Sequence, residues 1–324
     1  MTAPLVSVVV LTLRRPAYLA LTLQSVLAQT YEPLEIIVSD NGSGDQTPDV
    51  VAQFSSPGLR FRQNHTTVDI CTHLNQCLAE VRGKYYVVIS DDDLISPDFV
   101  ADNVAILETR KEVTVSLAHC QTIDRNGHVT KDLGIPAWKT CSGVEFLLDW
   151  LKLRRPVYFA TLFSMFARTE LVKRNGGYPI FRGGSNVDNA VFVGLALHGD
   201  VGFAHEALFQ YRVYGESYGL SISYTLLAQA MSDFVTYLNN DAGMIKLFSR
   251  LPVSQVRAIR QGAAQGSANY YLNFLAGKFV AGMSAADLIR GLRAYLPSIA
   301  YTRALCRFPL YLAKQSLRRW GLVR

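Results

Sequence analysis

Acidic residues follow two buried, strand-like segments and one glycine-rich turn, where they could hold a metal ion or accept a proton. Asp40 follows Leu34–Val38, the run Asp91–Asp93 follows Tyr85–Ile89, and Asp188 follows the turn. Ligands of an open parallel sheet bind at the carboxyl ends of its strands, where several loops meet. The positions of these acids therefore predict a ligand site at that edge of a sheet.

Three consecutive carboxylates need a counter-charge. Two unit charges about 4 Å apart repel by about 4 kcal/mol at an effective dielectric near 20. A divalent cation such as Mg²⁺ or Mn²⁺ removes this repulsion, and it commonly takes one or two carboxylates together with substrate phosphates. The run Asp91–Asp93 therefore predicts a metal that links the protein to a diphosphate. The alternative is that one or two of these acids cap the helix after Pro97, which Ser96 could also do.

Alternating strand and helix patterns over the first 200 or so residues predict βαβ units and a mostly parallel sheet. Helices are expected after Pro16 and Pro97, with the helical run Ala190–Leu197 beyond Asp188. The expected strands are Leu5–Thr12, Leu34–Val38, Tyr85–Ile89, Val113–Cys120 and Val157–Phe166.

The last third of the chain has a different, purely helical pattern. One apolar stripe at helical spacing consists of Leu226, Leu227, Ala230, Met231, Phe234 and Leu238. Ser284 and Asp287 resemble a capping box that begins a further helix. We therefore predict an α/β domain over residues 1–217 and an all-helical region over residues 218–324.

The net charge of +6 is concentrated near the C-terminus. Residues 288–324 hold eight basic and no acidic residues, so the remaining 24 basic and 26 acidic residues sum to −2. The basic residues alternate with aromatic ones such as Tyr295, Tyr301 and Trp320, as in segments that lie on anionic membranes. We expect the inner membrane surface as the partner. A solvated helix face is the alternative, and nucleic acid is disfavoured because no nucleic-acid-binding module accompanies the charge.

Composition excludes several classes of protein. With 324 residues, 49% hydrophobic and 18% charged, the chain can bury a large core and is neither disordered nor a disulfide scaffold. We find no apolar stretch of the roughly 18 to 20 residues that a membrane span needs and no secretory signal, so we expect a cytoplasmic location. Five scattered cysteines are expected to be reduced, mostly core residues. The six histidines have no metal-like spacing.

Several segments closely resemble family 2 glycosyltransferases, in the order that this family shows. The resemblance spans about residues 5–217 and rests on 6–16, 23–31, 35–43, 83–86 with Ser90–Asp93, Gly176–Tyr178 followed by Asp188, and Tyr211–Arg212. Some positions depart from the family pattern: Ser90 replaces its first motif aspartate, Leu13 and Arg14 an aromatic–asparagine pair, and Tyr214 a histidine.

The resemblance implies a GT-A fold, a nucleoside-diphosphate sugar donor, a divalent metal (Mn²⁺ or Mg²⁺) and inversion at the anomeric carbon. It implies nucleotide-binding roles for Leu11, Thr12, Arg15, Asp40 and Asp91. It implies metal ligation by Asp92 and Asp93, and a catalytic base at Asp188. Further donor or acceptor contacts are implied for Asn41, Gly177, Tyr178 and Arg212. The alternatives are purely structural roles: a helix cap for Asp188, an Asx turn for Asp40 and a surface ion pair for Arg212.

We therefore expect a metal-dependent inverting glycosyltransferase that acts on a glycan acceptor in bacterial surface polysaccharide assembly, such as O-antigen or lipopolysaccharide synthesis. The basic, aromatic C-terminus suggests that the acceptor is lipid-linked. One alternative is an inactive, membrane-peripheral scaffold that keeps the fold. A sugar nucleotidyltransferase is disfavoured because Leu11–Pro16 contains no glycine for a triphosphate loop, and an aspartyl-phosphate phosphatase because no aspartate ends the first strand.

Overall fold

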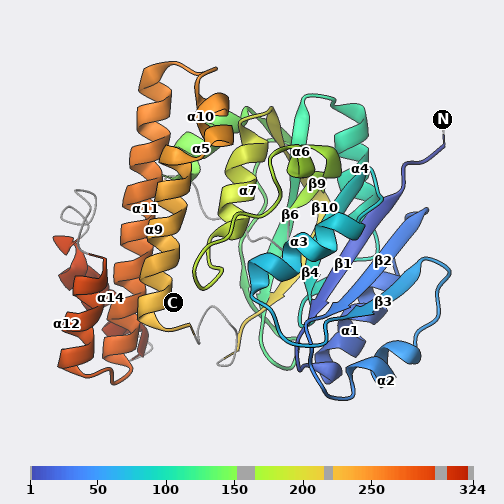
Figure 1. The fold of residues 1–324 in the computed structure, drawn as a ribbon, viewed down its shortest axis with the longest axis horizontal. Coiled ribbons are helices and arrows are strands. Elements are labelled where there is room, and N and C mark those ends of the chain that lie inside the picture. Colours follow the sequence, from blue (N-terminus) through green and yellow to red (C-terminus); the bar gives the residue numbers. More distant parts are fainter. Residues whose placement is uncertain (1, 152–164, 215–221, 296–304, 320–324) are drawn as a thin grey trace. The chain divides into compact units, whose positions relative to one another are not determined.

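The computed structural model describes residues 2–151, 165–214, 222–295 and 305–319, which form two compact units (Figure 1). The described part of the sheet unit is 2–146, 165–180 and 187–214. The described part of the helical unit is 147–151, 181–186, 222–295 and 305–319. The predicted domain boundary between residues 217 and 218 lies outside the described residues.

The sheet unit contains one mixed sheet with the strand order β3-β2-β1-β4-β9-β6-β10-β5, in which β7 also pairs with β6 and β8 with β10. Its strands are β1 (Val6–Thr12), β2 (Leu34–Asp40), β3 (Leu59–Gln63), β4 (Tyr85–Ser90), β5 (Leu94–Ile95), β6 (Val113–Ile123), β7 (Val129–Asp132), β8 (Thr140–Cys141), β9 (Phe166–Arg168) and β10 (Asp200–Arg212). Its helices are α1 (Pro16–Leu27), α2 (Thr47–Ala52), α3 (Ile70–Glu80), α4 (Phe99–Thr109), α6 (Thr169–Arg174) and α7 (Val187–Ala196), and α5 (Gly143–Leu151) begins in this unit.

The four strands β3, β2, β1 and β4 are parallel, as the βαβ pattern predicts. Beyond β4 the sheet is mixed, because the short β9 runs antiparallel to both β4 and β6. The predicted α/β class with flanking helices is confirmed. The predicted strand Val157–Phe166 falls largely outside the described residues, and Phe166 begins β9.

Helices cover both faces of the central parallel strands, which explains why β1 and β4 consist mostly of buried apolar residues. Val6, Val8 and Val10 of β1 belong to the buried core that also holds side chains of α1 and α4. On the other face, Ser39 Oγ of β2 lies 2.7 Å from His73 Nε2 of α3. Figure 1 shows α3 crossing in front of the strands.

The amino ends of β1 and β4 approach each other at Gly83, just before β4. A Cβ atom at Gly83 would lie 2.6 Å from the backbone nitrogen of Ser7 and 2.8 Å from its Oγ. The Gly83 N–H instead donates to Ser7 Oγ at 2.9 Å. The spacing of the two strands therefore requires a glycine at this position.

A single buried carboxylate, Glu35, lies at the same amino edge and is surrounded by donors. Ser7 Oγ donates to it at 2.5 Å and the Arg82 backbone N–H at 3.0 Å. The guanidinium groups of Arg60 and Arg82 both lie 2.8 Å from Glu35 Oε1. The residue is 5% exposed, so these partners replace the water that burial removes.

The helical unit is formed by α9 (Tyr224–Asn240), α10 (Ala242–Phe248), α11 (Val253–Val280), α12 (Ala285–Ala294) and α14 (Phe308–Arg319). Ser284 caps α12 by accepting the Asp287 backbone N–H at 3.1 Å, as the capping-box pattern predicts. The stripe predicted on α9 is buried except for Leu226, which is 41% exposed. The predicted helical C-terminal region is confirmed. Among the described residues, no helix combines the length and the apolar character that crossing a bilayer requires.

The five cysteines form no disulfide bond with one another among the described residues. Cys71, Cys77 and Cys120 are core residues, whereas Cys141 is partly buried and Cys306 is exposed.

Candidate active site

The acids at the end of β4 lie beside the loop that follows β1, because the two strands are parallel neighbours. Leu11, 6% exposed, is in register with Ser90, and its carbonyl accepts the Asp91 N–H at 2.9 Å. Thr12 Oγ1 donates to Asp91 Oδ2 at 2.8 Å, and the Leu13 backbone N–H donates to the same oxygen at 3.1 Å. The first loop and the acidic run therefore form one cluster.

One guanidinium nitrogen bridges two of the three acids. Arg15 Nη1 lies 3.1 Å from Asp91 Oδ1 and 2.7 Å from Asp92 Oδ2. Tyr214 supports this arrangement, since its hydroxyl donates to Asp92 Oδ2 at 3.0 Å and its ring centroid lies 5.9 Å from the Arg15 guanidinium. The Arg15 side chain is 26% exposed, whereas those of Asp91 and Asp92 are 3% and 7% exposed.

Asp93 is the most enclosed of the three acids, with no exposed surface. Its Oδ1 accepts the backbone N–H of Arg212 at 2.8 Å, and its Oδ2 has no hydrogen-bond partner in the part of the chain that the structure describes. Burial, and then repulsion by Asp92, raise the pKa of Asp93 well above its ordinary value.

The cluster carries more negative charge than its partners neutralise. Burial raises the pKa of Asp91 to about 6 although Arg15 lowers it, and the neighbouring Asp92 raises it further. A pair of unit charges about 4 Å apart repels by about 4 kcal/mol at an effective dielectric near 20, so an added cation would relieve the cluster.

The donor set fits a hard divalent cation. Carboxylate oxygens are the ligands that Mg²⁺ and Mn²⁺ prefer, Asp93 Oδ2 is an unpartnered buried oxygen, and the Arg15 guanidinium already marks a cation position on Asp92. In the residues that the structure describes, no three His, Cys, Asp or Glu side chains converge as a metal cage. The residues therefore fit an ion held by one or two carboxylates and completed by a ligand.

None of the three acids caps the following helix, so the alternative that this run only caps a helix is excluded. The N-cap of α4 is Asp98, which makes no side-chain cap hydrogen bond. Ser96 instead accepts the Leu208 N–H at 3.0 Å through its hydroxyl.

Arg212 is 2% exposed and is not a surface ion-pair residue. Its Nε donates to the Asp92 carbonyl at 2.8 Å, and its Nη1 donates to the carbonyls of Asp124 and Arg125 at 2.8 and 3.2 Å. Its guanidinium carbon lies 4.9 Å from the centroid of the Tyr18 ring. Arg212 therefore holds the backbone of the acidic run.

Asp40 and Asn41 at the end of β2 have their polar atoms engaged within the protein. Asp40 is fully buried, with Oδ1 accepting the Ser43 N–H at 3.0 Å and Oδ2 accepting Gln63 Nε2 at 2.7 Å. The bond to Ser43 is the local contact of an Asx turn, the structural role that is the alternative for Asp40. Asn41 holds the next loop through bonds of 2.9 and 3.1 Å to the Val68 backbone. The Arg14 N–H donates to Ser43 Oγ at 2.8 Å, which links this turn to the first loop.

Gly177 and Tyr178 are anchored to α3. The backbone N–H and carbonyl of Tyr178 bond to the Asn75 amide at 2.9 and 2.7 Å. A Cβ atom at Gly177, whose φ is +77°, would lie 2.5 Å from Asn75 Oδ1. The Tyr178 hydroxyl lies 2.7 Å from the Tyr86 hydroxyl in the core.

Asp188 lies in the first turn of α7 and is partly buried. Burial comes first among the causes that raise the pKa of Tyr178 well above its ordinary value, and the charge of Asp188 contributes. The charge of Asp188 is therefore felt at the Tyr178 hydroxyl, which in turn lies against Tyr86 of β4. A helix N-terminus favours an ionised carboxylate at this position.

Two aromatic residues of the cluster were not predicted as site residues. Tyr214 had a signal, because it occupies the position where the family often has histidine. Tyr18 lies against Arg212, and its ring centroid is 5.4 Å from that of Tyr214. No sequence signal indicated Tyr18, because only the fold brings this part of α1 to the cluster.

This chain belongs to glycosyl transferase family 2. The model of that family matches residues 7–173, just over half of the 324 residues, and this range contains the first loop and the acidic run.

Among relatives, it is 31% identical over 134 residues to an uncharacterized glycosyltransferase of Haemophilus influenzae, covering 41% of this chain and 40% of the relative. It is 26% identical over 136 residues to one of Methanocaldococcus jannaschii, covering 41% of this chain and 47% of the relative. The matched stretch thus spans less than half of each relative.

Solved structures with a similar fold cover nearly the whole chain. TarS 1–349 of Staphylococcus aureus in complex with UDP-GlcNAc has a TM-score of 0.64 at 16% identity, over 98% of this chain and 92% of that one. The mannosyltransferase PcManGT from Pyrobaculum calidifontis in complex with GDP-Man and Mn²⁺ has a TM-score of 0.56 at 19% identity, over 98% and 88%. The fold is therefore of the GT-A type, as the resemblance implied.

Proposed function

We propose that this protein is a metal-dependent, inverting glycosyltransferase that moves a sugar from a nucleoside-diphosphate donor to a hydroxyl of a lipid-linked glycan in bacterial surface polysaccharide assembly. The observation that carries the proposal is the cluster of Thr12, Arg15 and Asp91–Asp93 in a chain of glycosyl transferase family 2. An excess of buried carboxylates at the carboxyl ends of parallel strands favours a cationic, phosphate-bearing ligand over a structural role.

The donor is held, in this proposal, by the loops that end β1, β2 and β4. Arg15 is the cation available to the donor diphosphate, and Thr12 and Asp91 line the same loop, which also contains Leu11. Asp40 and Asn41 shape the neighbouring turn at the base-binding side. Solved neighbours bind UDP-GlcNAc and GDP-Man, which supports a nucleotide-sugar donor and leaves the base open.

Asp92 and Asp93 would hold the divalent metal. A bound Mn²⁺ or Mg²⁺ would supply Lewis-acid stabilisation of the negative charge that develops on the leaving diphosphate. Arg212 positions Asp92 through the Asp92 carbonyl and Asp93 through its own backbone N–H. The Mn²⁺ complex of the structural neighbour PcManGT supports a divalent metal in this proposal.

Asp188 would accept the proton of the acceptor hydroxyl. A hydroxyl is a weak nucleophile near neutral pH, so a carboxylate that takes its proton during attack lowers the barrier. A single displacement from the face opposite the leaving group inverts the anomeric configuration. Tyr178 and Gly177, which anchor the segment before Asp188 to α3, would keep that carboxylate in place.

The first test is a thermal-shift panel of UDP, dTDP, GDP and CDP, each with and without Mn²⁺. We expect one nucleotide to stabilise the protein only when Mn²⁺ is present, because ligand that binds the native state raises the midpoint. Activated sugars of that base, incubated with extracted lipid-linked oligosaccharides, should then yield a product that mass spectrometry identifies. A panel with no shift would favour the inactive scaffold.

The base assignment is tested by Asp188→Asn, with Asp49→Asn as a matched control. Asp49 is an exposed acid in the first turn of α2, so it reproduces the helix-terminus position without the proposed chemistry. We expect Asp188→Asn to keep donor binding and to abolish transfer, while Asp49→Asn keeps both. Near-normal turnover of Asp188→Asn would remove Asp188 from this role.

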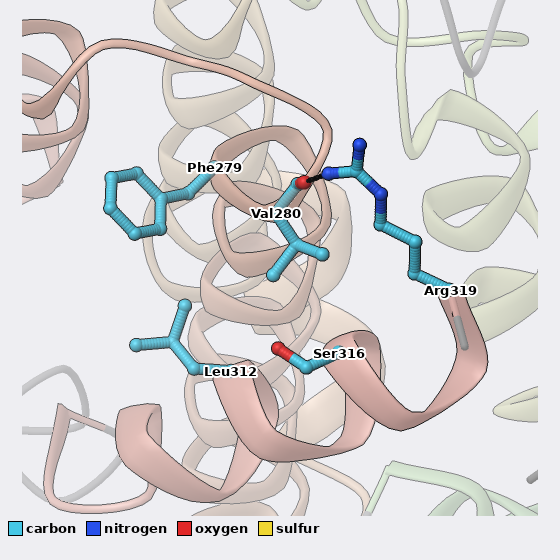
Figure 2. Close-up of a pocket in the computed structure, with 5 residues that line it drawn as sticks. All are labelled: Phe279, Val280, Leu312, Ser316 and Arg319. Atoms are coloured by element: carbon cyan, nitrogen blue, oxygen red, sulfur yellow. Dashed lines mark hydrogen bonds between the residues drawn. The ribbon is translucent and has the colours of Figure 1, made fainter. Parts of the chain in front are cut away.

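A peripheral location on the inner membrane surface is also part of the proposal. In its described residues α14 carries Lys314, Arg318 and Arg319 and no acid, while Leu310 and Leu317 are 68% and 41% exposed. A groove of about 660 Å³ between α11 and α14 is lined by Phe279, Val280, Leu312, Ser316 and Arg319 (Figure 2). Exposed leucines beside basic side chains that form no ion pair among the described residues suit an anionic lipid surface.

Cosedimentation with vesicles tests this location. Vesicles that contain phosphatidylglycerol should bind the protein, and pure phosphatidylcholine vesicles should not. The double variant Lys314→Glu, Arg318→Glu should lose this binding, whereas Lys246→Glu, Arg250→Glu, on exposed residues in and just after α10, should retain it. Equal binding by both variants would contradict the assignment to α14.

A further inference from the structure

We propose that Arg15 is an exchangeable counter-cation: it neutralises Asp92 in the empty site and must leave that carboxylate before a divalent metal can bind there, so that metal and nucleotide bind as a coupled pair. This inference rests on the proposed function, which assigns Asp92 to the metal and Arg15 to the donor diphosphate.

The geometry points to competition for one oxygen atom. Asp92 Oδ2 accepts Arg15 Nη1 at 2.7 Å and the Tyr214 hydroxyl at 3.0 Å, so a cation approaching that oxygen meets an occupied position. Among the described residues, no other cationic side chain forms an ion pair with Asp91 or Asp92. Arg212, although close, directs its guanidinium to backbone carbonyls.

Arg15 is also the most exposed charged member of the cluster. Its side chain is 26% exposed while its two carboxylate partners are almost completely buried. Tyr214 packs beside the guanidinium but does not enclose it, with 5.9 Å between its ring centroid and the guanidinium carbon. A diphosphate that enters beside the first loop offers Arg15 another anionic partner, and a guanidinium binds phosphate oxygens well. The exchange leaves Asp92 open at the moment that the nucleotide arrives.

A nitrogen that bridges two acids acts here as a point charge. Arg15 uses Nη1 alone for Asp91 and Asp92, so a lysine ammonium could replace it, whereas a neutral glutamine could not. The neighbouring Arg14 provides a matched control, since it is exposed and makes no ion pair in the described part of the chain. Removing either arginine changes the net charge by the same amount.

The experiment is a Mn²⁺ titration followed by the electron paramagnetic resonance signal of free Mn²⁺, without nucleotide and with saturating UDP or GDP. Without nucleotide we expect Arg15→Gln to bind Mn²⁺ at least tenfold more tightly than the wild type. Arg14→Gln should stay within twofold and Arg15→Lys within threefold of the wild type. Nucleotide should strengthen Mn²⁺ binding to the wild type by a larger factor than to Arg15→Gln. Thermal unfolding checks that each variant is folded. If the glutamine variant is not, equal Mn²⁺ affinities of the wild type with and without nucleotide would still refute the coupling.

Two outcomes would overturn the proposal, and they are distinguishable. Equal Mn²⁺ affinities of Arg15→Gln and Arg14→Gln, in a protein that binds Mn²⁺ with nucleotide, would refute the exchange and leave the metal-dependent function intact. Absence of Mn²⁺ binding to the wild type with either nucleotide would remove the metal site itself, and the exchange with it.

Discussion

Glu35, near the amino end of β2, and Asp91, just beyond the carboxyl end of β4, are both buried carboxylates whose pKa values move in opposite directions. Burial raises the pKa of Glu35, but hydrogen bonds from Ser7, Arg82 and Arg60 outweigh it, so the pKa lies below 4.5. At Asp91 burial dominates and the pKa rises to about 6 despite Arg15.

The difference lies in the ratio of acids to donors. At the amino edge two arginines, a hydroxyl and a backbone N–H serve one carboxylate. At the carboxyl edge Arg15 is the one ion-pair partner of the three carboxylates in the described residues, and an oxygen of Asp93 has no hydrogen-bond partner there. A satisfied carboxylate contributes to stability, whereas a surplus of buried charge is tolerated where a ligand completes the site. The two edges of one set of strands therefore separate stability from function.

The largest effect should follow the removal of charge from the carboxyl edge. Asp92→Asn should reduce transfer at least about a thousandfold, because loss of several kcal/mol of charge stabilisation in the transition state corresponds to such a factor. Turnover is measured with the donor that the nucleotide panel identifies. Glu35→Gln at the amino edge is the control, and its turnover should stay within about threefold at temperatures where it is folded. A similar loss of turnover in both variants would contradict the proposed difference between the two edges.

A pH effect is expected from His73, a neutral base beneath the carboxyl end of β2. Burial lowers its pKa from 6.5 to about 4, with a further contribution from Arg62. Its Nε2 lies 2.7 Å from Ser39 Oγ, which accepts Arg62 Nη1 at 2.7 Å, so the nearby charge of Arg62 opposes a second proton on the ring.

The sign follows from the lowered pKa. The unfolded chain binds the His73 proton below pH 6.5, and the folded chain only below about pH 4. Above pH 6.5 this difference in proton binding does not reduce the free energy of unfolding. As the pH falls from 6.5 to 4, it reduces the free energy of unfolding by about 3 kcal/mol. His73→Gln should show a smaller loss over that range in urea unfolding. Parallel pH profiles of the two proteins would contradict the neutral histidine.

Stability should be more sensitive at the amino edge. Glu35→Gln should lower the free energy of unfolding by about 2 kcal/mol, because two guanidinium groups and a backbone N–H lose a charged acceptor. Asp92→Asn should change the free energy by less than about 1 kcal/mol or raise it, since it relieves repulsion within the acidic run. Chemical denaturation measures both, and a larger loss in Asp92→Asn would reverse the proposed roles of the two edges.

The smallest effect is expected at the rim of the amino-edge network. Glu80 lies 3.4 Å from Arg60 and 2.9 Å from Arg62, and its side chain is 37% exposed. Exposed ion pairs contribute little, so Glu80→Gln should cost less than about 1 kcal/mol and lose that effect in high salt. A cost equal to that of Glu35→Gln would show that burial does not decide the strength of this network.

Much of the fold could be predicted from local patterns. Apolar runs such as Val6–Thr12 and Tyr85–Ser90 are short and bounded by turns, which is typical of buried parallel strands. The antiparallel β9 could not be predicted with the correct bounds, because three residues carry no periodicity and their pairing with β4 and β6 depends on distant parts of the chain.

The candidate site also has one part that the sequence could predict and one part that it could not. Adjacency of the Thr12 loop to Asp91 follows from parallel pairing, so the sequence could indicate that these residues meet. The burial of Arg212 and its bonds to Asp92, Asp124 and Arg125 come from loops that converge only in three dimensions. The metal-binding role of Asp92 and the catalytic role of Asp188 remain predictions, which the variants above test. The nucleotide-binding role of Asp40 also remains a prediction.

The close approach of Gly83 to Ser7 sets where β4 begins and, through the rigid strand, where its far end delivers the acids. A methyl group there would push the strand aside, and the displacement would be felt roughly 20 Å away. In a saturation survey scored by sugar transfer, Gly83 should therefore behave like an active-site position, although it lies at the opposite end of β4 from the acidic run. An engineer who alters donor preference should hold this glycine constant while varying the first loop.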